Sequence, residues 1–226
     1  MTSRDFSEKT HWEKAAQTRM GKYLTRMETE FIQNSISLSK CNALMDVGAE
    51  AGRFSQFQAE KIPVISIDID SYGLQRLKLK SRHANVIQAD ARRIPIKDET
   101  LDAILVIEVL DYIPEMNEAL AESYRVLKPE ASLIISFGNK SSLKAKLREM
   151  QGKSYLHSYK SVIASLLKTG FKLKKRVGYN WLPFGRTSEN PLIPILIGIE
   201  RFFALRRIPR YSPWVIIHAE KPSLDS

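Results

Sequence analysis

Four short apolar segments in the first half of the chain each contain or end in a carboxylate. These carboxylates are Asp46, Asp68, Asp90 and Glu108. A glycine-containing turn, residues 48–52, follows the first of them. Carboxylate oxygens accept hydrogen bonds from hydroxyl and amino groups, and a glycine turn lets a ligand approach the backbone closely. Together these residue types suit the binding of a nucleoside.

The spacing of these residues indicates what each would contact. An acidic residue about 20 positions after a glycine turn can take both hydroxyls of a ribose, and Asp68 lies 20 residues after Gly48. Asp90 can accept from the exocyclic amine of adenine. The turn contains no lysine, so it lacks the triphosphate cradle of a P-loop. Glu108 has two open interpretations, contact with the ligand or capping of a following helix.

These side chains need a scaffold that brings them together. Apolar runs at 43–48, 63–68, 84–90, 101–108 and 132–137 predict buried strands. Helical spacing in the segments between them, including 52–61 and 71–80, predicts helices that alternate with the strands. Such alternation predicts a parallel sheet covered on both faces, with ligands bound outside the carboxyl ends of the strands.

The two ends of the chain differ from this pattern. Residues 12–36 predict one helix that only Gly21 interrupts, within a helical cap formed by residues 1–40. Near the C-terminus, 171–179 and 214–221 predict two further strands. The 34 residues between them, 180–213, are too many for a hairpin, so we expect an insertion with its own helix.

Several sequence motifs occur in one order along residues 41–179. They are DVGAEAG at 46–52, SIDID at 66–70, QADARRIPIKDETLD at 88–102, EVLDYI at 108–113, RVLKPEA at 125–131 and TGF at 169–171. In these motifs the chain resembles the class I S-adenosylmethionine-dependent methyltransferases that act on small molecules. The resemblance implies a Rossmann-like α/β fold: a doubly wound, mostly parallel seven-stranded sheet with an antiparallel last strand. Residues 41–226 would form this domain.

The resemblance also implies a role for each matched residue, with S-adenosylmethionine as the cofactor. Gly48, Ala49 and Gly52 would contact its methionine part. Asp68, with Ile69 beside it, would bind the ribose diol, and Asp90 and Ala91 would flank adenine. Ile107 and Glu108 would lie near the methionine amino group and the methyl group. Asp46 would support the turn.

Glu50 departs from the family pattern, which has glycine at this position. Its side chain would either crowd the cofactor or pair with the cofactor ammonium. A tolerated variant and a degenerate fold that serves as a membrane or partner adaptor both remain open. Catalysis by methyl transfer depends mainly on holding donor and acceptor in line. No catalytic dyad is evident, and the candidates for a general base are His11, Tyr23, Tyr112 and His157.

Charge is distributed unevenly along the chain, whose formal net charge is +10. Residues 41–136 hold 11 basic and 15 acidic side chains, whereas residues 137–226 hold 17 and 5. The surplus therefore lies in the region expected to select the acceptor. It favours a small-molecule acceptor that is anionic, lipid-like or glycan-linked, or contact with a membrane surface.

The segment 191–210 joins an aliphatic and aromatic run to three arginines. Its roughly 14 apolar-rich residues are too few to span a bilayer as one helix. Two interpretations stay open: a lid over the acceptor pocket, and a peripheral helix that lies on anionic lipid.

Other classes of function fit the sequence less well. A nicotinamide-dependent oxidoreductase would need a G-x-G-x-x-G turn, which Gly48 and Gly52 do not supply. An RNA methyltransferase would be expected to show basic residues interleaved with stacking aromatics, and none are evident. The one cysteine, Cys41, excludes a disulfide within the chain and a multi-cysteine zinc site. With no apolar leader, this favours a reducing, cytoplasmic setting.

Overall fold

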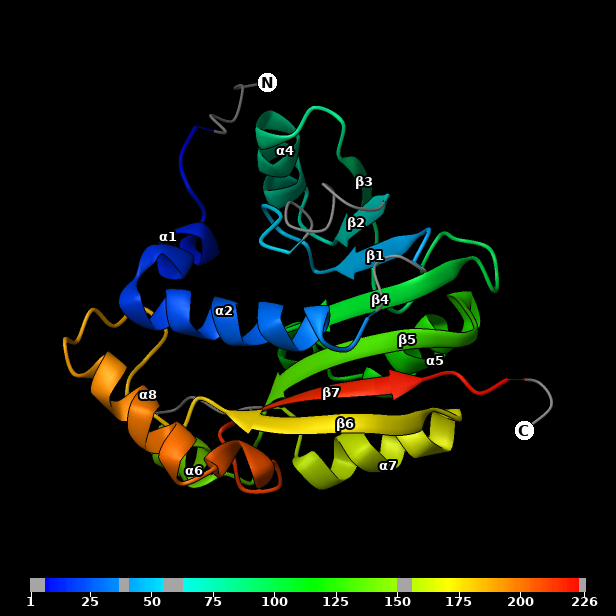
Figure 1. The fold of residues 1–226 in the computed structure, drawn as a ribbon. Coiled ribbons are helices and arrows are strands. Elements are labelled where there is room, and N and C mark those ends of the chain that lie inside the picture. Colours follow the sequence, from blue (N-terminus) through cyan, green and yellow to red (C-terminus); the bar gives the residue numbers. More distant parts are fainter. Residues whose placement is uncertain (1–6, 37–40, 55–62, 150–155, 224–226) are drawn as a thin grey trace.

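The computed structural model describes residues 7–36, 41–54, 63–149 and 156–223. They form a seven-stranded sheet with the order β3-β2-β1-β4-β5-β7-β6 (Figure 1). The strands are β1 (Leu44–Val47), β2 (Val64–Asp68), β3 (Asn85–Gln88), β4 (Leu101–Ile107), β5 (Leu127–Gly138), β6 (Lys172–Tyr179) and β7 (Trp214–Glu220). Strands β1 to β5 pair in parallel, and β7 pairs antiparallel with both β5 and β6. The predicted Rossmann-like fold with an antiparallel last strand is confirmed.

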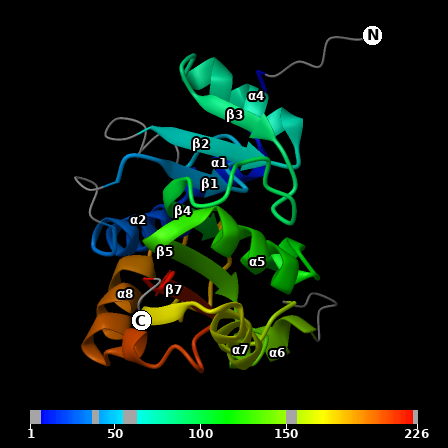
Figure 2. The same cartoon turned by 90° about the vertical axis from the view of Figure 1, so that its right-hand side faces the viewer.

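Helices cover both faces of this sheet. They are α1 (His11–Gln17), α2 (Arg19–Gln33), α4 (Ser71–Lys80), α5 (Met116–Val126), α6 (Leu143–Glu149), α7 (Tyr159–Thr169) and α8 (Ile193–Phe202), with short 3-10 turns η2 (Leu110–Tyr112) and η3 (Leu205–Arg207). Figure 2 shows α2 and α8 on one side of the sheet and α5 and α7 on the other. Each side has its own core of buried apolar side chains. Strand β4, six of whose seven residues are buried, contributes to both, as expected of a central parallel strand.

The predicted single N-terminal helix is wrong, because the chain turns at Thr18. The Thr18 backbone is extended (ψ 162°), and its side chain accepts from the Gly21 N–H and so caps the start of α2. Gly21 lies inside α2 and does not interrupt it. A Cβ on Gly21 would lie 1.9 Å from the Ala15 carbonyl oxygen, so the close approach of α1 to α2 requires glycine there.

Two further predictions from the sequence have different outcomes. The predicted helix at 52–61 falls mainly on residues 55–62, outside the described part of the chain. The predicted insertion at 180–213 does hold a helix, α8. Within the described ranges, no helix combines the length and the apolar composition that crossing a bilayer requires.

Strand order locates the place where a ligand would bind. The chain runs from β1 outward to β2 and β3, and then returns to place β4 on the other side of β1. The loops that leave β1 and β4 therefore diverge, which opens a crevice at the carboxyl ends of these two strands.

Candidate functional site

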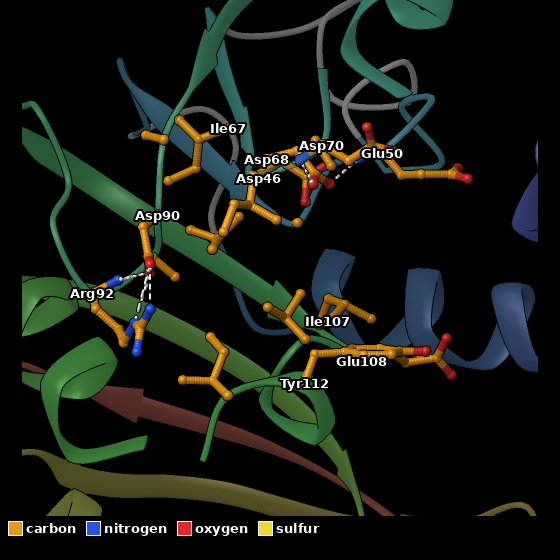
Figure 3. A pocket seen from close by; sticks show the side chains of 18 of the residues that line it. Asp46, Glu50, Ile67, Asp68, Asp70, Asp90, Arg92, Ile107, Glu108 and Tyr112 are labelled. Atoms are coloured by element: carbon orange, nitrogen blue, oxygen red, sulfur yellow. Dashed lines mark hydrogen bonds and ion pairs between the residues drawn. The ribbon is translucent and has the colours of Figure 1, made fainter. Parts of the chain in front are cut away.

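A cavity of about 440 Å³ lies at this crevice. Its lining comes from the turn after β1, the ends of β2, β3 and β4, and Trp12 of α1. Ten of the eleven residues predicted to contact a cofactor are in the lining: Asp46, Gly48, Ala49, Glu50, Asp68, Ile69, Asp90, Ala91, Ile107 and Glu108. Figure 3 shows three groups around the cavity, with Glu50 and Asp68 in one, Asp90 in the second and Glu108 in the third.

The turn after β1 depends on glycine at Gly48. Its φ is +69°, and a Cβ there would lie 2.3 Å from Val109 Cγ2. The N–H groups of Gly48 and Ala49 both donate to the Ile67 carbonyl, at 2.8 and 3.0 Å. These bonds hold the turn against β2, so the backbone of the turn forms a fixed wall of the cavity.

Gly52 is the predicted site residue that lies outside the cavity lining. Its φ is +82°, and a Cβ there would lie 2.4 Å from Leu77 Cδ1 on α4. Glycine at this position therefore permits the turn to pack against α4.

Asp68 is held by backbone donors on both sides. The Glu50 N–H donates to its Oδ2 and the Asp70 N–H donates to its Oδ1, each at 2.8 Å. Each carboxylate oxygen can accept more than one hydrogen bond. The carboxylate is thus oriented by the turn and retains the capacity to accept from two neighbouring hydroxyl groups.

Glu50 occupies the glycine position of the turn with a left-handed backbone, φ +47°. Its carboxylate Oε2 accepts from the Ala51 N–H at 3.0 Å. Its Cα and Cγ lie against Gly73 of α4, where a Cβ would approach them to 2.8 and 3.0 Å. In Figure 3 its side chain extends away from Asp68. Gly73 therefore provides the space that this departure from the pattern needs.

Asp90 forms a local ion pair with Arg92, which the sequence pattern did not predict. Its Oδ2 accepts from Arg92 Nη2 at 2.6 Å and its Oδ1 from the Arg92 N–H at 2.8 Å. These hydrogen bonds lower the pKa of Asp90. Its carboxylate can still accept from a ligand, but it is not a free acceptor. Beside it, Ile69 is 68% exposed and gives this end of the cavity an apolar surface.

Glu108 belongs to a buried group at the opposite end of the cavity. We name Glu28, Arg53, Glu108 and Arg186 the Arg–Glu cluster. Arg53 Nη2 lies 3.2 Å from Glu108 Oε2, and Arg186 pairs with Glu108 Oε1. Glu28, from α2, is fully buried and lies 3.4 Å from Arg53 Nη1. Two carboxylates and two guanidinium groups thus balance their charges in a largely buried position, with Arg53 and Glu108 facing the cavity.

Two other contacts fix this cluster. Tyr179 donates its hydroxyl to Glu28 Oε1 at 2.7 Å, and burial together with the charge of Glu28 raises the tyrosine pKa. Arg186 lies over the Trp12 ring, 5.4 Å from its centroid. Burial and the neighbouring charge of Arg53 lower the Arg186 pKa to about 9, so this side chain stays charged at neutral pH. The cluster therefore joins the cap, the insertion and β4.

The two interpretations of Glu108 can now be compared with its contacts. The N-cap of η2 is Val109, which makes no side-chain cap hydrogen bond. Glu108 instead has a φ of +62°, and its N–H donates to Ser136 Oγ at 3.0 Å. Its carboxylate is directed into the Arg–Glu cluster, so capping of the following helix is excluded.

Sequence reasoning missed Trp12, Glu28, Arg53 and Arg186. One signal was available for Glu28, a carboxylate on the apolar stripe of α2 between Leu24 and Phe31. Arg53 directly follows the glycine turn. No comparable signal marks Trp12 or Arg186, because only the folding of the cap and insertion brings them to the cavity.

The four candidates for a general base are placed differently. Tyr112 lines the cavity and is 66% exposed. His157 is buried, with Nε2 2.8 Å from the Ile113 carbonyl oxygen. Tyr23 donates to Glu200 at 2.7 Å, and burial raises its pKa. His11 packs edge-on against Trp12. Of the four, Tyr112 alone is in the cavity lining.

Comparisons with known proteins agree with this geometry. Residues 45–135 match the family model described as a methyltransferase domain. An uncharacterised protein of Methanocaldococcus jannaschii is 33% identical over 147 residues, 62% of each chain. The 24-methylenesterol C-methyltransferase 3 of Arabidopsis thaliana is 26% identical over 67% of this chain and 47% of its own length. This chain thus spans less than two thirds of these curated relatives.

A solved structure extends the similarity in fold to nearly the whole chain. The N-methyltransferase NodS of Bradyrhizobium japonicum, in complex with S-adenosyl-L-homocysteine, superposes with a TM-score of 0.68. It covers 97% of this chain and 96% of its own at 16% identity. The cavity lies at the switch point between β1 and β4, and a methyltransferase-domain model matches residues 45–135. On this evidence residues 45–135 form a methyltransferase domain, and the fold of nearly the whole chain is similar to that of an S-adenosylmethionine-dependent methyltransferase.

Proposed function

We propose that this protein transfers a methyl group from S-adenosylmethionine to a small-molecule acceptor. The observation that carries the proposal is the position of Asp68. The turn after β1 orients its carboxylate toward a cavity at the switch point of the sheet. A carboxylate held there suits the two hydroxyls of a ribose.

The remaining lining fits the other parts of the cofactor. Ile69, Ala89 and Ala91 provide apolar surface for adenine, next to Asp90. At the opposite end, the carboxylate of Glu108 and the guanidinium of Arg53 suit the ammonium and carboxylate of the methionine part. A cavity of about 440 Å³ is also within the usual range for one ligand of this size.

When bound, S-adenosylmethionine would supply a methyl group already activated by its positively charged sulfur. The protein then has to orient the acceptor and exclude water. Trp12 lines the cavity, and Arg186 packs on Trp12 and pairs with Glu108, so the cap and the insertion close one end of the site. An acceptor whose reacting atom is already unprotonated, such as a neutral amine or a thiolate, needs no general base to activate it.

We also propose that the acceptor is anionic or lipid-like. The excess of 17 basic over 5 acidic side chains in residues 137–226 supports an anionic character. The name of the Arabidopsis relative, a sterol C-methyltransferase, supports a lipid-like one.

Calorimetry with the full chain tests the cofactor assignment. We expect S-adenosylmethionine and S-adenosylhomocysteine to bind at one site, and NAD(H) not to bind. Release of S-adenosylhomocysteine in the presence of a small-molecule extract, and none without it, would show transfer. Binding of NAD(H) without binding of S-adenosylmethionine would refute the proposal.

A further inference from the structure

Helix α8 has two apolar faces, and only one of them is buried. Ile193 and Glu200 face the protein, whereas Ile195 is 63% exposed and Phe202 is 84% exposed. The exposed side continues past the helix through Phe203. We name this surface the α8 ridge. It consists of Leu192, Ile195, Ile199, Phe202, Phe203, Ile208 and Tyr211. Large exposed apolar side chains gathered on one helix and the segment that follows it are typical of a site of interaction.

The orientation of α8 is fixed by a buried polar contact. Glu200 is 1% exposed, and its Oε1 accepts from the Tyr23 hydroxyl at 2.7 Å and from Arg206 Nε at 3.1 Å. Rotating the helix to bury Phe202 would break these bonds and separate a buried carboxylate from its partners, which is costly. The fold therefore holds the apolar ridge outward.

All exposed charge along the ridge is positive. Arg201, Arg207 and Arg210 are exposed, and none of them forms an ion pair with another described residue. The only carboxylate between residues 190 and 219 is Glu200, which is buried. Apolar side chains flanked by arginines without a carboxylate partner match a surface with an apolar interior and anionic groups at its boundary.

The ridge lies at the same edge of the sheet as the candidate site. Figure 1 places α8 at the edge of the molecule toward which the arrowheads of β1 and β5 point, and residues that line the cavity follow the strands at that edge. The loop that carries Arg186 into the Arg–Glu cluster leads directly into α8. Its backbone is tied to the cap, because Thr18 Oγ1 donates to the Arg186 carbonyl at 2.8 Å. Cap, loop and ridge thus form one continuous structure.

We propose that the α8 ridge docks the protein on the surface of an anionic lipid membrane, with the helix parallel to that surface. Four of the seven ridge residues are aliphatic, and aliphatic side chains contribute by burial in lipid but do not stack on nucleic acid bases. The three aromatic ones, Phe202, Phe203 and Tyr211, also suit a membrane interface, so the ridge as a whole fits a membrane better than RNA. This inference does not depend on the methyl acceptor or on activity.

Vesicle flotation with the full chain tests the proposal. We expect binding to phosphatidylcholine vesicles that contain phosphatidylglycerol and much weaker binding to phosphatidylcholine alone. The double variant Phe202→Ser, Phe203→Ser should lower the partition coefficient at least about tenfold, because it removes two inserting side chains. Arg207→Gln with Arg210→Gln should lower it by about tenfold or more and remove the lipid dependence.

Matched variants control for general effects of polarity and charge. Leu79→Ser changes a side chain that is 67% exposed on α4, and Lys160→Gln removes an exposed charge on α7. Neither should change flotation. Because Phe202 and Phe203 are exposed, their variants should fold, and unchanged calorimetric affinity for S-adenosylmethionine would verify this.

Three results would overturn the proposal. The first is wild-type protein that does not float with anionic vesicles, or ridge variants that float equally well. The second is loss of RNA retention on a filter in the arginine variants, with unchanged vesicle binding. The third is sedimentation of the wild type as a dimer that the Phe202→Ser, Phe203→Ser variant does not form, without vesicle binding. A failure to bind S-adenosylmethionine would instead refute the proposed function and would not affect the proposal of membrane docking.

Discussion

The two ends of the cavity are built in different ways. At the nucleoside end, Asp68 is held by the N–H groups of Glu50 and Asp70, and Asp90 by its neighbour Arg92. At the other end, the Arg–Glu cluster is held by side chains from α2, the residue after β4, the turn after β1 and the insertion. The first end depends on residues within 18 positions of each other, whereas the second joins residues as far apart as 28 and 186.

This difference shows where changes should affect binding and where they should affect folding. Backbone bonds at strand ends form with the sheet itself, so substitutions there should act mainly on ligand affinity. A buried charge cluster has to be assembled from separate elements, and loss of one member leaves its partners uncompensated. Substitutions at Glu28, which does not line the cavity, should therefore act mainly on stability, whereas those at Arg53 and Glu108 should also affect ligand affinity.

Glu28→Gln is expected to have the largest effect. It keeps an acceptor for Tyr179 but leaves Arg53 and Arg186 with one carboxylate instead of two. Removing one partner from a buried ion pair typically costs about 3–5 kcal/mol. Urea denaturation should show a loss of this order. The exposed Glu30→Gln, on the same helix, should change the free energy of unfolding by less than about 0.5 kcal/mol. Equal effects of the two would show that the cluster does not stabilise the fold.

The contact of α1 with α4 should contribute less to the stability of the fold at acid pH. Burial favours the neutral form of Glu13, but hydrogen bonds from Arg76 and Lys80 on α4 outweigh it and lower its pKa from 4.5 to about 2. A lowered carboxyl pKa stabilises the fold above the unfolded value, and this contribution is lost as pH falls from about 4.5 to about 2.

The contribution of Glu13 to the free energy of unfolding is about 2 kcal/mol. Its side chain is 11% exposed, and partial screening by water reduces the contribution to this value. Denaturation between pH 6 and pH 3 should show it, and Glu13→Gln should remove that part of the pH dependence. The exposed Glu8→Gln is the matched control. An unchanged pH profile in the Glu13 variant would contradict the assignment.

Asp68→Ala should weaken S-adenosylmethionine binding at least about tenfold, because it removes the acceptor for two hydroxyls. Calorimetry measures this directly. Asp70→Ala is the useful comparison, since Asp70 also lines the cavity but its Oδ1 accepts from the Tyr72 N–H and caps α4. If the two variants bind the cofactor alike, Asp68 has no special role in the site.

Glu50→Gly should have the smallest effect. Glycine relieves the left-handed backbone at this position but gains freedom in the unfolded chain, so stability should change by no more than about 1 kcal/mol. Cofactor affinity should stay within about threefold, because the carboxylate is turned toward α4. A wild type that does not bind, together with a variant that does, would favour the degenerate adaptor.

The strands could be predicted from the sequence because a buried strand appears as a short run of apolar residues. The apolar run that forms β4 and the acidic strand ends Asp68 and Asp90 required no knowledge of distant contacts. The break at Thr18 was not readable, because threonine is tolerated within helices and only the packing of α1 on α2 selects its capping role. The partner of Asp90, Arg92, lies only two residues further along the chain and was still missed, since a side-chain rotamer decides the contact.

The sequence by itself determined the sheet, the glycine turn and the carboxylates at the strand ends, because strand periodicity places these residues on one edge whatever surrounds them. Tertiary structure alone decided the closed end of the cavity. The contact of Arg186 with Glu108, and the outward face of α8 set by Glu200 and Tyr23, arise from long-range pairing of buried polar groups. Such pairing depends on where separate elements pack, which no local pattern records.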